Sequence, residues 1–272
     1  MDFFNKENNA QNQKYKQGQN NMTNIILCGC GGRMGEAVSK LVSSCPDAKI
    51  VAGIDINTVA ISDFPVYQSI REFPDRADVI VDFSHHSSLP SLLEYATATS
   101  TPIVVCTTGH TDTELELMKS AAQKVAVFFS GNMSIGINLL MELCKKASET
   151  LGTAFDVEII EKHHNQKLDA PSGTALMLAD SIADTRDQSE YVYDRHSVRR
   201  KRSDAEIGIH SVRGGTIVGE HEVIFAGNNE MITLSHSAMS REIFASGALR
   251  AAIYSAKKPA GMYNMSDLIN GR

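Results

Sequence analysis

A glycine-rich turn between an apolar strand and a helix places the strongest constraint on the fold of this chain. Residues 23–27 form a short apolar run that leads into Cys28-Gly-Cys-Gly-Gly-Arg-Met-Gly, and helical composition follows over 36–43. A second apolar run, 48–54, ends at Asp55. Strand, glycine turn, helix, strand and acidic residue in this order are typical of a dinucleotide-binding βαβ unit. The sequence therefore predicts a nucleotide cofactor at this turn.

The glycines and the acidic residue each have a physical role in that interpretation. Gly29 permits the tight turn, while Gly31 and Gly32 let the backbone approach a pyrophosphate. Gly35 allows the helix to pack closely on the strand. The free N–H groups and positive dipole end of the helix then face the phosphates. Asp55 is placed to accept hydrogen bonds from the adenosine ribose hydroxyls.

The residues around Asp55 also bear on which nicotinamide cofactor is used. Ile56 follows Asp55 at the position where an Arg would hold the 2′-phosphate of NADPH, so this position favours NADH. Arg33 in the turn, or Asn57, remains an alternative partner for a phosphate. We therefore expect NADH or NADPH as the cofactor, with NADH favoured.

Strand and helix patterns continue to alternate after this first unit. Apolar strands are predicted at 77–83, 102–106 and 125–129, with helices at 89–97 and 113–124. Strands that are apolar throughout indicate a parallel sheet covered on both faces, so we expect a Rossmann-type, doubly wound α/β fold. Ligands of such sheets bind beyond the carboxyl ends of the strands. The candidates to line the nicotinamide side follow the last two strands: Thr107, Thr108, Gly109, Gly131 and Asn132.

Two other polar clusters are interpreted as ordinary surface or loop groups. His85 and His86 follow the strand at 77–83, and adjacent histidines at such a place are more typical of loop polar groups than of catalysts. The basic run Arg199-Arg-Lys-Arg202 is interpreted as a solvated loop. A contact with an anionic substrate or with another subunit is the alternative for this run.

The second half of the chain changes character after a long predicted helix at 136–150. Segments 207–211, 216–225 and 230–235 alternate polar and apolar residues between glycine turns, which indicates antiparallel sheet. A further helix is predicted at 241–255. We expect a second, smaller α+β domain built on a mixed or antiparallel sheet.

These patterns predict the domain organisation. The dinucleotide-binding domain is expected over 22–134 and is completed by about 240–272, and the second domain spans 135–239. Residues 1–21 are rich in Asn, Gln and Lys and almost free of aliphatic residues. Such a segment cannot bury enough surface to offset its ordering entropy, so a disordered tail is expected there.

The stretch 158–175 carries chemistry that the first domain lacks. A histidine titrates near neutrality, so His163 or His164 can donate and accept protons at working pH. Lys167 supplies a positive charge with hydrogen-bond donors. The Ser172-Gly173-Thr174 sequence, at the predicted start of a helix, offers N–H groups and hydroxyls that suit a carboxylate. Together these residues suit an anionic substrate that is protonated while a hydride is delivered from the nicotinamide.

A metal site is the competing interpretation of the same stretch. The two histidines and Asp169 carry atoms that can ligate zinc. Adjacent histidines rarely share one tetrahedral geometry, however, and no third His or Cys lies at a helpful spacing. We therefore expect no metal.

Composition limits the compartment and the partners. The formal net charge of -6 argues weakly against nucleic acid as the main partner. No apolar run approaches the ~20 residues that a membrane span needs, and the N-terminus lacks the apolar core of a signal peptide. The scattered cysteines contain no Cys-x-x-Cys pair, which favours reduced thiols in a cytosolic protein. They are Cys28, Cys30, Cys45, Cys106 and Cys144.

Several motifs, taken together, identify a family. They are Glu161-Lys-His163-His164-Asn-Gln-Lys167-Leu-Asp169-Ala-Pro-Ser-Gly173-Thr174-Ala, Gly29-Cys-Gly-Gly-Arg33-Met34-Gly35, Cys106-Thr107-Thr108-Gly109, Ser130-Gly-Asn-Met133 and Arg213-Gly-Gly-Thr-Ile-Val-Gly-Glu-His. They resemble, nearly residue for residue, those of the dihydrodipicolinate reductase (4-hydroxy-tetrahydrodipicolinate reductase) family of the diaminopimelate–lysine pathway. The resemblance covers about 24–268.

The resemblance implies a cytosolic homotetramer that reduces a cyclic dicarboxylate with NAD(P)H to tetrahydrodipicolinate. It implies that His163 is the proton donor and acceptor, that Lys167 is the partner proton donor, and that the domain at 135–239 serves substrate binding and tetramerisation. The residues implied to hold the substrate's carboxylates are His164, Gly173 and Thr174. The matching cofactor positions are Gly29, Cys30, Gly31, Gly32, Arg33, Met34, Asp55, Cys106, Thr107, Thr108, Ser130, Gly131, Asn132 and Met133.

The chain departs from the family pattern mainly around the cofactor. Asp55 replaces the Glu of some relatives, Ile56 replaces an Arg that would grip the NADPH phosphate, and Cys106 stands where many members have Gly. Another nicotinamide-dependent dehydrogenase is the alternative enzyme, but it does not explain the long motif of 161–175. A catalytically silent NAD-binding sensor is the alternative from another class. Such a protein would be expected to lose His163 or Lys167, and both are present.

Overall fold

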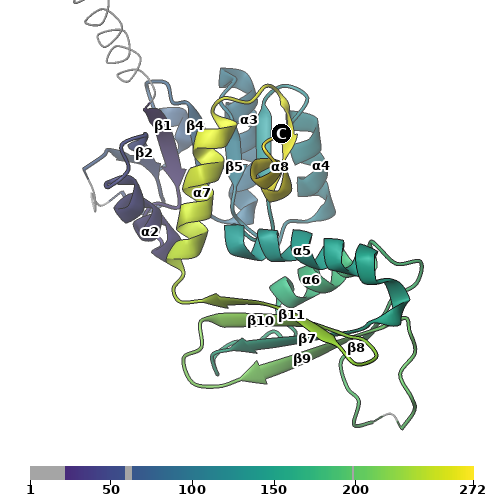
Figure 1. The fold of residues 1–272 in the computed structure, drawn as a ribbon. Helices are drawn as coiled ribbons and strands as arrows, with labels where there is room; N and C mark the ends of the chain where they lie inside the picture. The colour runs from purple at the N-terminus through teal and green to yellow at the C-terminus, as the bar shows by residue number, and fades with distance from the viewer. Residues whose placement is uncertain (1–21, 59–62, 198) are drawn as a thin grey trace, which may run out of the picture. The chain divides into compact units, whose positions relative to one another are not determined.

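The structure, a computed structural model, describes residues 22–58, 63–197 and 199–272 (Figure 1). The tail predicted to be disordered, 1–21, lies outside the described residues. The chain divides into two compact units. Unit 1 comprises the described residues up to Gly131 together with Ala245–Asn264, and unit 2 comprises Asn132–Phe244 together with Met265–Arg272.

Unit 1 is built on a parallel sheet with the order β12-β6-β5-β4-β1-β2-β3 among its described residues. Every strand pair in it is parallel, which confirms the Rossmann-type, doubly wound class. The strands are β1 (Thr23–Cys28), β2 (Ala48–Ile54), β3 (Val66–Tyr67), β4 (Val79–Asp82), β5 (Ile103–Val105), β6 (Ala126–Phe129) and β12 (Gly261–Tyr263). The helices are α2 (Arg33–Val42), α3 (Leu89–Thr99), α4 (Asp112–Ala121) and α7 (Glu242–Ser255). Short 3-10 turns lie at Ile70–Glu72 and His86–Ser88.

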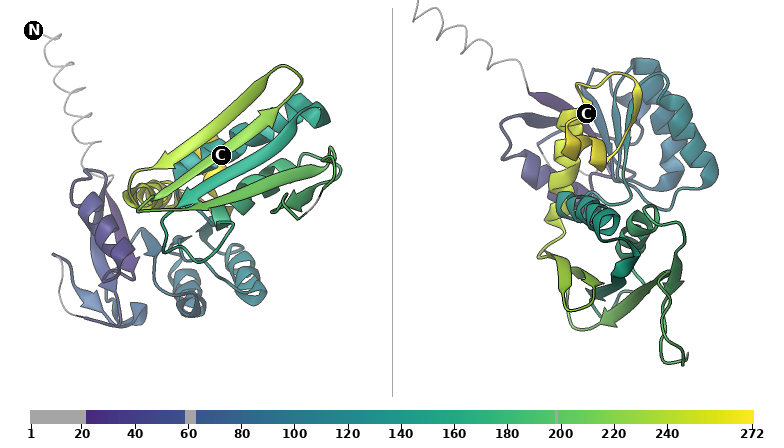
Figure 2. Two further views of the ribbon diagram at one scale, coloured as in Figure 1. Left: turned by 90° about the horizontal axis from the view of Figure 1, so that it is seen from below. Right: turned by 45° about the vertical axis from the view of Figure 1, so that its right-hand side comes forward.

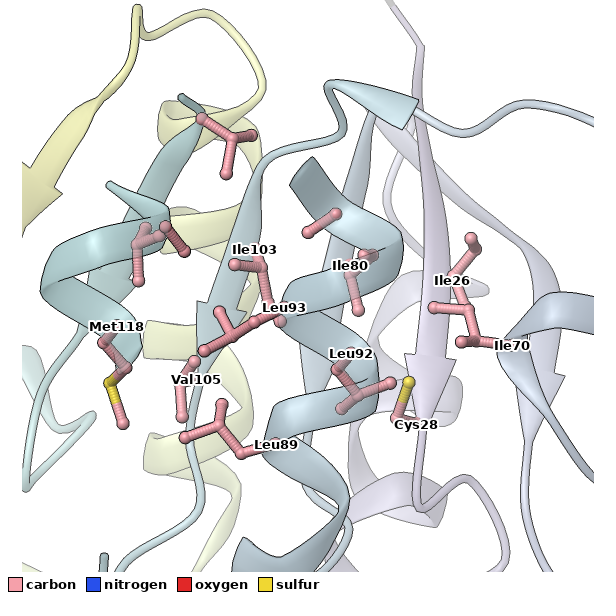
Figure 3. Packing of buried hydrophobic residues seen from close by; sticks show 14 of the residues in the cluster. Ile26, Cys28, Ile70, Ile80, Leu89, Leu92, Leu93, Ile103, Val105 and Met118 are labelled. Atoms are coloured by element: carbon pink, nitrogen blue, oxygen red, sulfur yellow. The ribbon is translucent and has the colours of Figure 1, made fainter. Parts of the chain in front are cut away.

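The core of unit 1 explains why its strands are apolar on both faces. Leu89, Leu92 and Leu93 of α3 pack with Ile103 and other strand residues on one side of the sheet (Figure 3). On the other side, the ring of Phe128 meets Tyr254 of α7 edge-on, with centroids 6.1 Å apart. Helices on both faces follow from the crossover connections that parallel strands require.

Unit 2 is built on a second sheet with the order β11-β10-β7-β9-β8. Its strands are β7 (Asp156–His163), β8 (Glu190–Val192), β9 (Glu206–Arg213), β10 (Gly219–Ala226) and β11 (Met231–Ala238). The β10–β11 and β10–β7 pairs are antiparallel, whereas β7–β9 and β8–β9 are parallel. The sheet is therefore mixed, which confirms the fold class. The antiparallel prediction is confirmed for the segments at 216–225 and 230–235. It is wrong for the pairing of 207–211, because β9 lies between β7 and β8 and is parallel to both.

Helices cover one face of this second sheet, as the two views in Figure 2 show. They are α5 (Ile135–Leu151) and α6 (Gly173–Ala183), joined to β7 by a short turn at Gly152–Ala154 and by the loop after His163. Their apolar residues pack on alternate strand residues, including Val157, Ile159, Val223 and Phe225. The opposite face of the same strands carries half-exposed side chains.

The closing segment of the chain divides between the units. Strand β12 adds to the sheet of unit 1 beside β6, whereas α8 (Met265–Asn270) belongs to unit 2. There, Ser266 Oγ donates to Glu142 Oε1 of α5 at 2.7 Å. Among the described residues, a helix with the length and apolar character of a membrane span is absent.

Candidate active site

The turn after β1 has the conformation that its glycines allow. Gly29 has a φ of 75°, in the region that favours glycine. A Cβ on Gly35 would lie 2.3 Å from the carbonyl oxygen of Gly29, so only glycine lets α2 approach the turn this closely. Helix α2 begins at Arg33, earlier than the predicted start at 36, because Gly32 is the N-cap.

The N-terminus of α2 suits an anion. Gly32 provides no side-chain cap, so the first N–H groups of the helix are left for a ligand. The Gly31 N–H donates to Asp55 Oδ2 at 2.9 Å, and the Asn57 N–H donates to Oδ1 at 3.1 Å. These bonds fix the carboxylate of Asp55 at the carboxyl end of β2, beside the turn.

A cleft of about 370 Å³ adjoins this turn. It is lined by Gly29, Gly32, Asp55, Ile56, Ser84 and His85, among others of unit 1. Ile56 is 85% exposed and presents an apolar side chain there. Glycine backbone, an uncapped helix start and a fixed carboxylate beside one cleft fit a dinucleotide.

The other predicted cofactor residues differ in what they expose. Arg33, Thr108 and Gly131 are exposed and Met34 is half-buried, whereas Cys30, Cys106, Thr107, Ser130 and Met133 are buried. The buried members therefore offer a ligand mainly their backbone groups. Asn132 belongs to unit 2, where its side chain accepts from the Ser134 N–H at 2.8 Å and donates to Thr174 Oγ1 at 3.0 Å.

In unit 2, His163 ends β7 and is held by a buried carboxylate. Its Nδ1 lies 2.6 Å from Glu161 Oε2. Glu161 is fully buried, and His163 is 9% exposed. A carboxylate can only accept, so Nδ1 carries a proton in this bond and Nε2 is left for a reacting group.

Arg213 of β9 and Ser172 hold Glu161 in turn. The Arg213 guanidinium donates to both oxygens of Glu161, at 2.7 and 2.8 Å, and the Ser172 N–H donates to Oε1 at 3.1 Å. Burial alone would raise the pKa of Glu161, but hydrogen bonds from Arg213 and His163 lower it to about 2. Glu161 is therefore a fixed negative charge behind His163 at neutral pH.

His221 of β10 completes the surroundings of His163. The two rings meet edge-on, with centroids 5.2 Å apart, and His221 Nε2 lies 3.1 Å from Ser172 Oγ. Burial, followed by the nearby charge of His163, lowers the pKa of His221 to about 4. His221 is therefore neutral at neutral pH, beside the ring of His163.

The start of α6 lies beside these groups and is open to a ligand. Ser172 is the N-cap, its Oγ accepting from the Ala175 N–H at 3.2 Å, and Gly173 is exposed. Because Asn132 donates to Thr174 Oγ1, the hydroxyl hydrogen of Thr174 is left to donate elsewhere. Backbone N–H groups and a hydroxyl at a helix start suit a carboxylate.

Lys167 and His164 lie in the loop between β7 and α6. Lys167 Nζ is 2.8 Å from Asp169 Oδ1, and its side chain is 22% exposed. The Lys167 N–H donates to the His164 carbonyl at 3.1 Å, which folds the loop into a turn. In the described part of the chain, no group of three or more His, Cys, Asp or Glu side chains is arranged to hold a metal ion.

Comparison with known proteins decides the family. A sequence model for the N-terminus of dihydrodipicolinate reductase matches residues 23–133, and one for its C-terminus matches 136–269. This chain belongs to the dihydrodipicolinate reductase family.

Individual relatives agree over most of the chain. The 4-hydroxy-tetrahydrodipicolinate reductase of Caldanaerobacter subterraneus subsp. tengcongensis is 50% identical over 249 residues, which cover 91% of this chain and 98% of that protein. The enzyme of the same name from Clostridium tetani is 49% identical, covering 92% and 98%. Among solved structures, dipicolinate-bound dihydrodipicolinate reductase from Paenisporosarcina sp. TG-14 has a TM-score of 0.74 and 27% identity, covering 89% and 97%.

Three residues that support His163, directly or through Glu161, were not predicted as site residues. Glu161, Arg213 and His221 come from three neighbouring strands. All three stand in family motifs, so a signal was present. Their roles depend on strand pairing across more than fifty residues, which the motifs do not reveal.

Proposed function

We propose that this chain is an oxidoreductase that reduces 4-hydroxy-tetrahydrodipicolinate to tetrahydrodipicolinate with NAD(P)H, in diaminopimelate and lysine biosynthesis. The relatives that cover nearly all of the chain carry the name of this activity. The reaction consumes one reduced dinucleotide and one proton, and it releases the oxidised dinucleotide and water. The nicotinamide, when bound, supplies the hydride.

The observation that carries the proposal is the contact of 2.6 Å between His163 Nδ1 and Glu161. It leaves Nε2 to exchange the proton that the reaction needs, and the charge of Glu161 stabilises the imidazolium whenever His163 holds that proton. Lys167 is the partner proton donor. Its ion pair with Asp169 restrains the Lys167 ammonium within the loop between β7 and α6.

The substrate's carboxylates are held by His164, Gly173 and Thr174. The exposed Gly173 and the hydroxyl hydrogen of Thr174 support this assignment, because both lie at the start of α6. The relative from Paenisporosarcina is a dipicolinate-bound structure. Dipicolinate is a dicarboxylate, which suits a site where Gly173 and the hydroxyl of Thr174 can bind carboxylates.

The cofactor is held by the turn Gly29–Met34, by Asp55, and by the strand-end segments Cys106–Thr108 and Ser130–Met133. NADH is favoured over NADPH for two reasons. The carboxylate of Asp55 repels a 2′-phosphate, and the exposed side chain beside it is that of Ile56, which offers no charge to hold one.

Purified protein tests the activity. NADH oxidation should occur only when the product of dihydrodipicolinate synthase is supplied, and His163→Ala should lower kcat by about a hundredfold or more. His210→Ala is the matched control, since His210 lies on β9 and pairs with Glu158 at 2.8 Å. Wild-type protein without this activity would overturn the proposal, and normal turnover in His163→Ala would overturn the role of His163.

We further propose a cytosolic homotetramer that associates through the face of the unit 2 sheet opposite α5 and α6. Ile160 and Ile224 are half-exposed there, and Met231 is 65% exposed. A second copy of the same face would bury these apolar side chains. Light scattering should give the mass of four chains, and Ile224→Glu should lower it; a monomeric wild-type protein would overturn this assembly.

A further inference from the structure

A polar network in unit 1 joins the carboxyl ends of β4 and β5 to the start of α4. Its members are Asp82, His86, Thr107, His110 and Glu114. We propose that His110 and Glu114 are positioning residues, which hold the Thr107–Thr108 peptide in the orientation that binds the nicotinamide half of the cofactor. This inference rests on the proposed function, which assigns Thr107 and Thr108 to the cofactor.

The floor of the network is Asp82, the last residue of β4, which is fully buried. Its Oδ1 accepts from the N–H and the hydroxyl of Ser84, at 2.9 and 2.5 Å. Its Oδ2 accepts from Thr107 Oγ1 at 3.2 Å. The hydroxyl hydrogen of Thr107 is thereby directed into the protein, and its oxygen is left as an acceptor.

His110 fixes the backbone of Thr107. Its Nε2 lies 3.1 Å from the Thr107 carbonyl oxygen and 3.0 Å from Thr107 Oγ1. A carbonyl oxygen can only accept, so Nε2 carries the hydrogen and donates to it. The His110 side chain is 1% exposed and its ring meets Phe129 edge-on. An apolar ring would fill the same space, but it would not hold the carbonyl.

Glu114, in the first turn of α4, holds His86 and Thr111, the residue next to His110. Its Oε2 accepts from the Thr111 N–H and lies 3.8 Å from His110 Nδ1, while its Oε1 lies 3.0 Å from His86 Nδ1. Hydrogen bonding from the Thr111 N–H, followed by that from His86, lowers the pKa of Glu114 to about 2. A helix cap needs only the bonds with Thr111. The bond with Thr111 fixes the residue next to His110, and the bond with His86 ties the cap to the loop after β4 as well.

Peptide planarity carries this restraint to the exposed side of the turn. With the Thr107 carbonyl directed at His110, the N–H of Thr108 points the opposite way. Thr108 and Gly109 are exposed, and Gly109 has a φ of 79°. An N–H so directed can donate to the carboxamide oxygen of a nicotinamide, whereas a rotated peptide would present a carbonyl instead.

Binding of two ligands distinguishes a local effect on the nicotinamide position from damage to the whole cofactor site. NADH contains the nicotinamide and ADP-ribose lacks it, so their dissociation constants report on the two halves of the cofactor site. His110→Phe keeps a ring against Phe129 but removes the N–H. We expect it to weaken NADH binding about tenfold while changing ADP-ribose binding less than about twofold. His110→Gln retains a side-chain N–H and should restore NADH affinity to within about threefold of wild type.

A second pair of variants tests Glu114. Glu114→Gln should weaken NADH binding selectively as well, by about threefold. Glu116→Gln, on the same helix and paired with the exposed Lys119 at 2.7 Å, is the matched control and should change neither constant. In turnover, His110→Phe should raise KM for NADH and leave KM for the dicarboxylate unchanged.

The outcomes are distinct. NADH affinity at the wild-type level in His110→Phe would overturn the inference, and so would a parallel loss of NADH and ADP-ribose affinity. Failure of His110→Gln to recover NADH affinity would also overturn it. Wild-type protein that binds neither ligand would instead overturn the proposed cofactor, and this inference with it.

Discussion

Glu161 and His163 lie two positions apart on β7, and the Glu161 carboxylate reaches His163 Nδ1 at 2.6 Å. Alternate residues of a strand share one face, so both side chains point to the side covered by α6. Val157 and Ile159 precede them on that face as ordinary core residues. The same face of β7 thus carries core residues in its first half and the proton-exchanging pair at its carboxyl end.

Glu161→Gln should lower kcat by about a hundredfold or more, because a neutral amide neither stabilises the imidazolium nor enforces the same tautomer of His163. KM for NADH should stay near the wild-type value, and steady-state kinetics with both substrates measure the two effects. Glu220→Gln is the control, since Glu220 pairs at 3.0 Å with Lys162 on the opposite face of the sheet. A kcat within twofold of wild type would remove Glu161 from the mechanism.

Gly219→Ala should impair turnover by crowding the reactive edge of His163. A Cβ at Gly219 would lie 3.1 Å from His163 Nε2, tighter than ordinary contact. We expect kcat to fall about tenfold as the ring shifts, with little change in the midpoint of thermal unfolding. Gly214→Ala is the matched control, because its Cβ would meet no atom within 4 Å. Equal kcat in both variants would show that this edge of the ring is not where the substrate reacts.

The parts of the structure that were predictable from sequence are those set by local pattern. The strands at 48–54 and 125–129, the turn at Gly29 and the start of α6 after Ser172 all follow from composition over a few residues. Each βαβ unit then adds to a parallel sheet by a right-handed crossover, which needs no further information.

The parts that were missed depend on pairing between distant segments. Strands β3, β8 and β12 have two or three residues each, and such short runs become strands only because a partner is present. The central place of β7 between β9 and β10 is also non-local. The same pairing brings Arg213 to Glu161, so the residues that support His163 were hidden although His163 itself was named.

Ile56→Arg should shift cofactor preference toward NADPH. The Ile56 side chain is exposed beside Asp55, so a guanidinium there can bind a 2′-phosphate. We expect the ratio of kcat/KM for NADPH to that for NADH to rise about tenfold, equivalent to ~1.4 kcal/mol. Lys49→Arg, at an exposed position of β2, adds no charge and serves as the control. A wild-type preference for NADPH above about tenfold would contradict the role given to Ile56.

His221→Gln should change how stability depends on pH. The fold lowers the pKa of His221 from 6.5 to about 4, chiefly by burial. Below pH 6.5, His221 is protonated in the unfolded chain but stays neutral in the folded chain. Its contribution to the unfolding free energy is therefore fully present above pH 6.5 and is lost as the pH falls toward 4. The loss amounts to at most about 3 kcal/mol.

Urea denaturation of wild type and His221→Gln between about pH 7 and 4 measures this effect. This range covers the titration of a histidine, whose ordinary pKa is about 6.5. The unfolding free energy of wild type should fall more steeply with acid than that of the variant, which has no proton to take up there. Glu161, whose pKa is lowered from 4.5 to about 2 by the fold, also contributes to the pH dependence, but it is present in both proteins and its contribution cancels in the comparison. A constant difference between the two proteins across the range would mean that His221 is as easily protonated in the folded chain as in the unfolded one. His221 would then no longer be the neutral neighbour that lets His163 carry the proton.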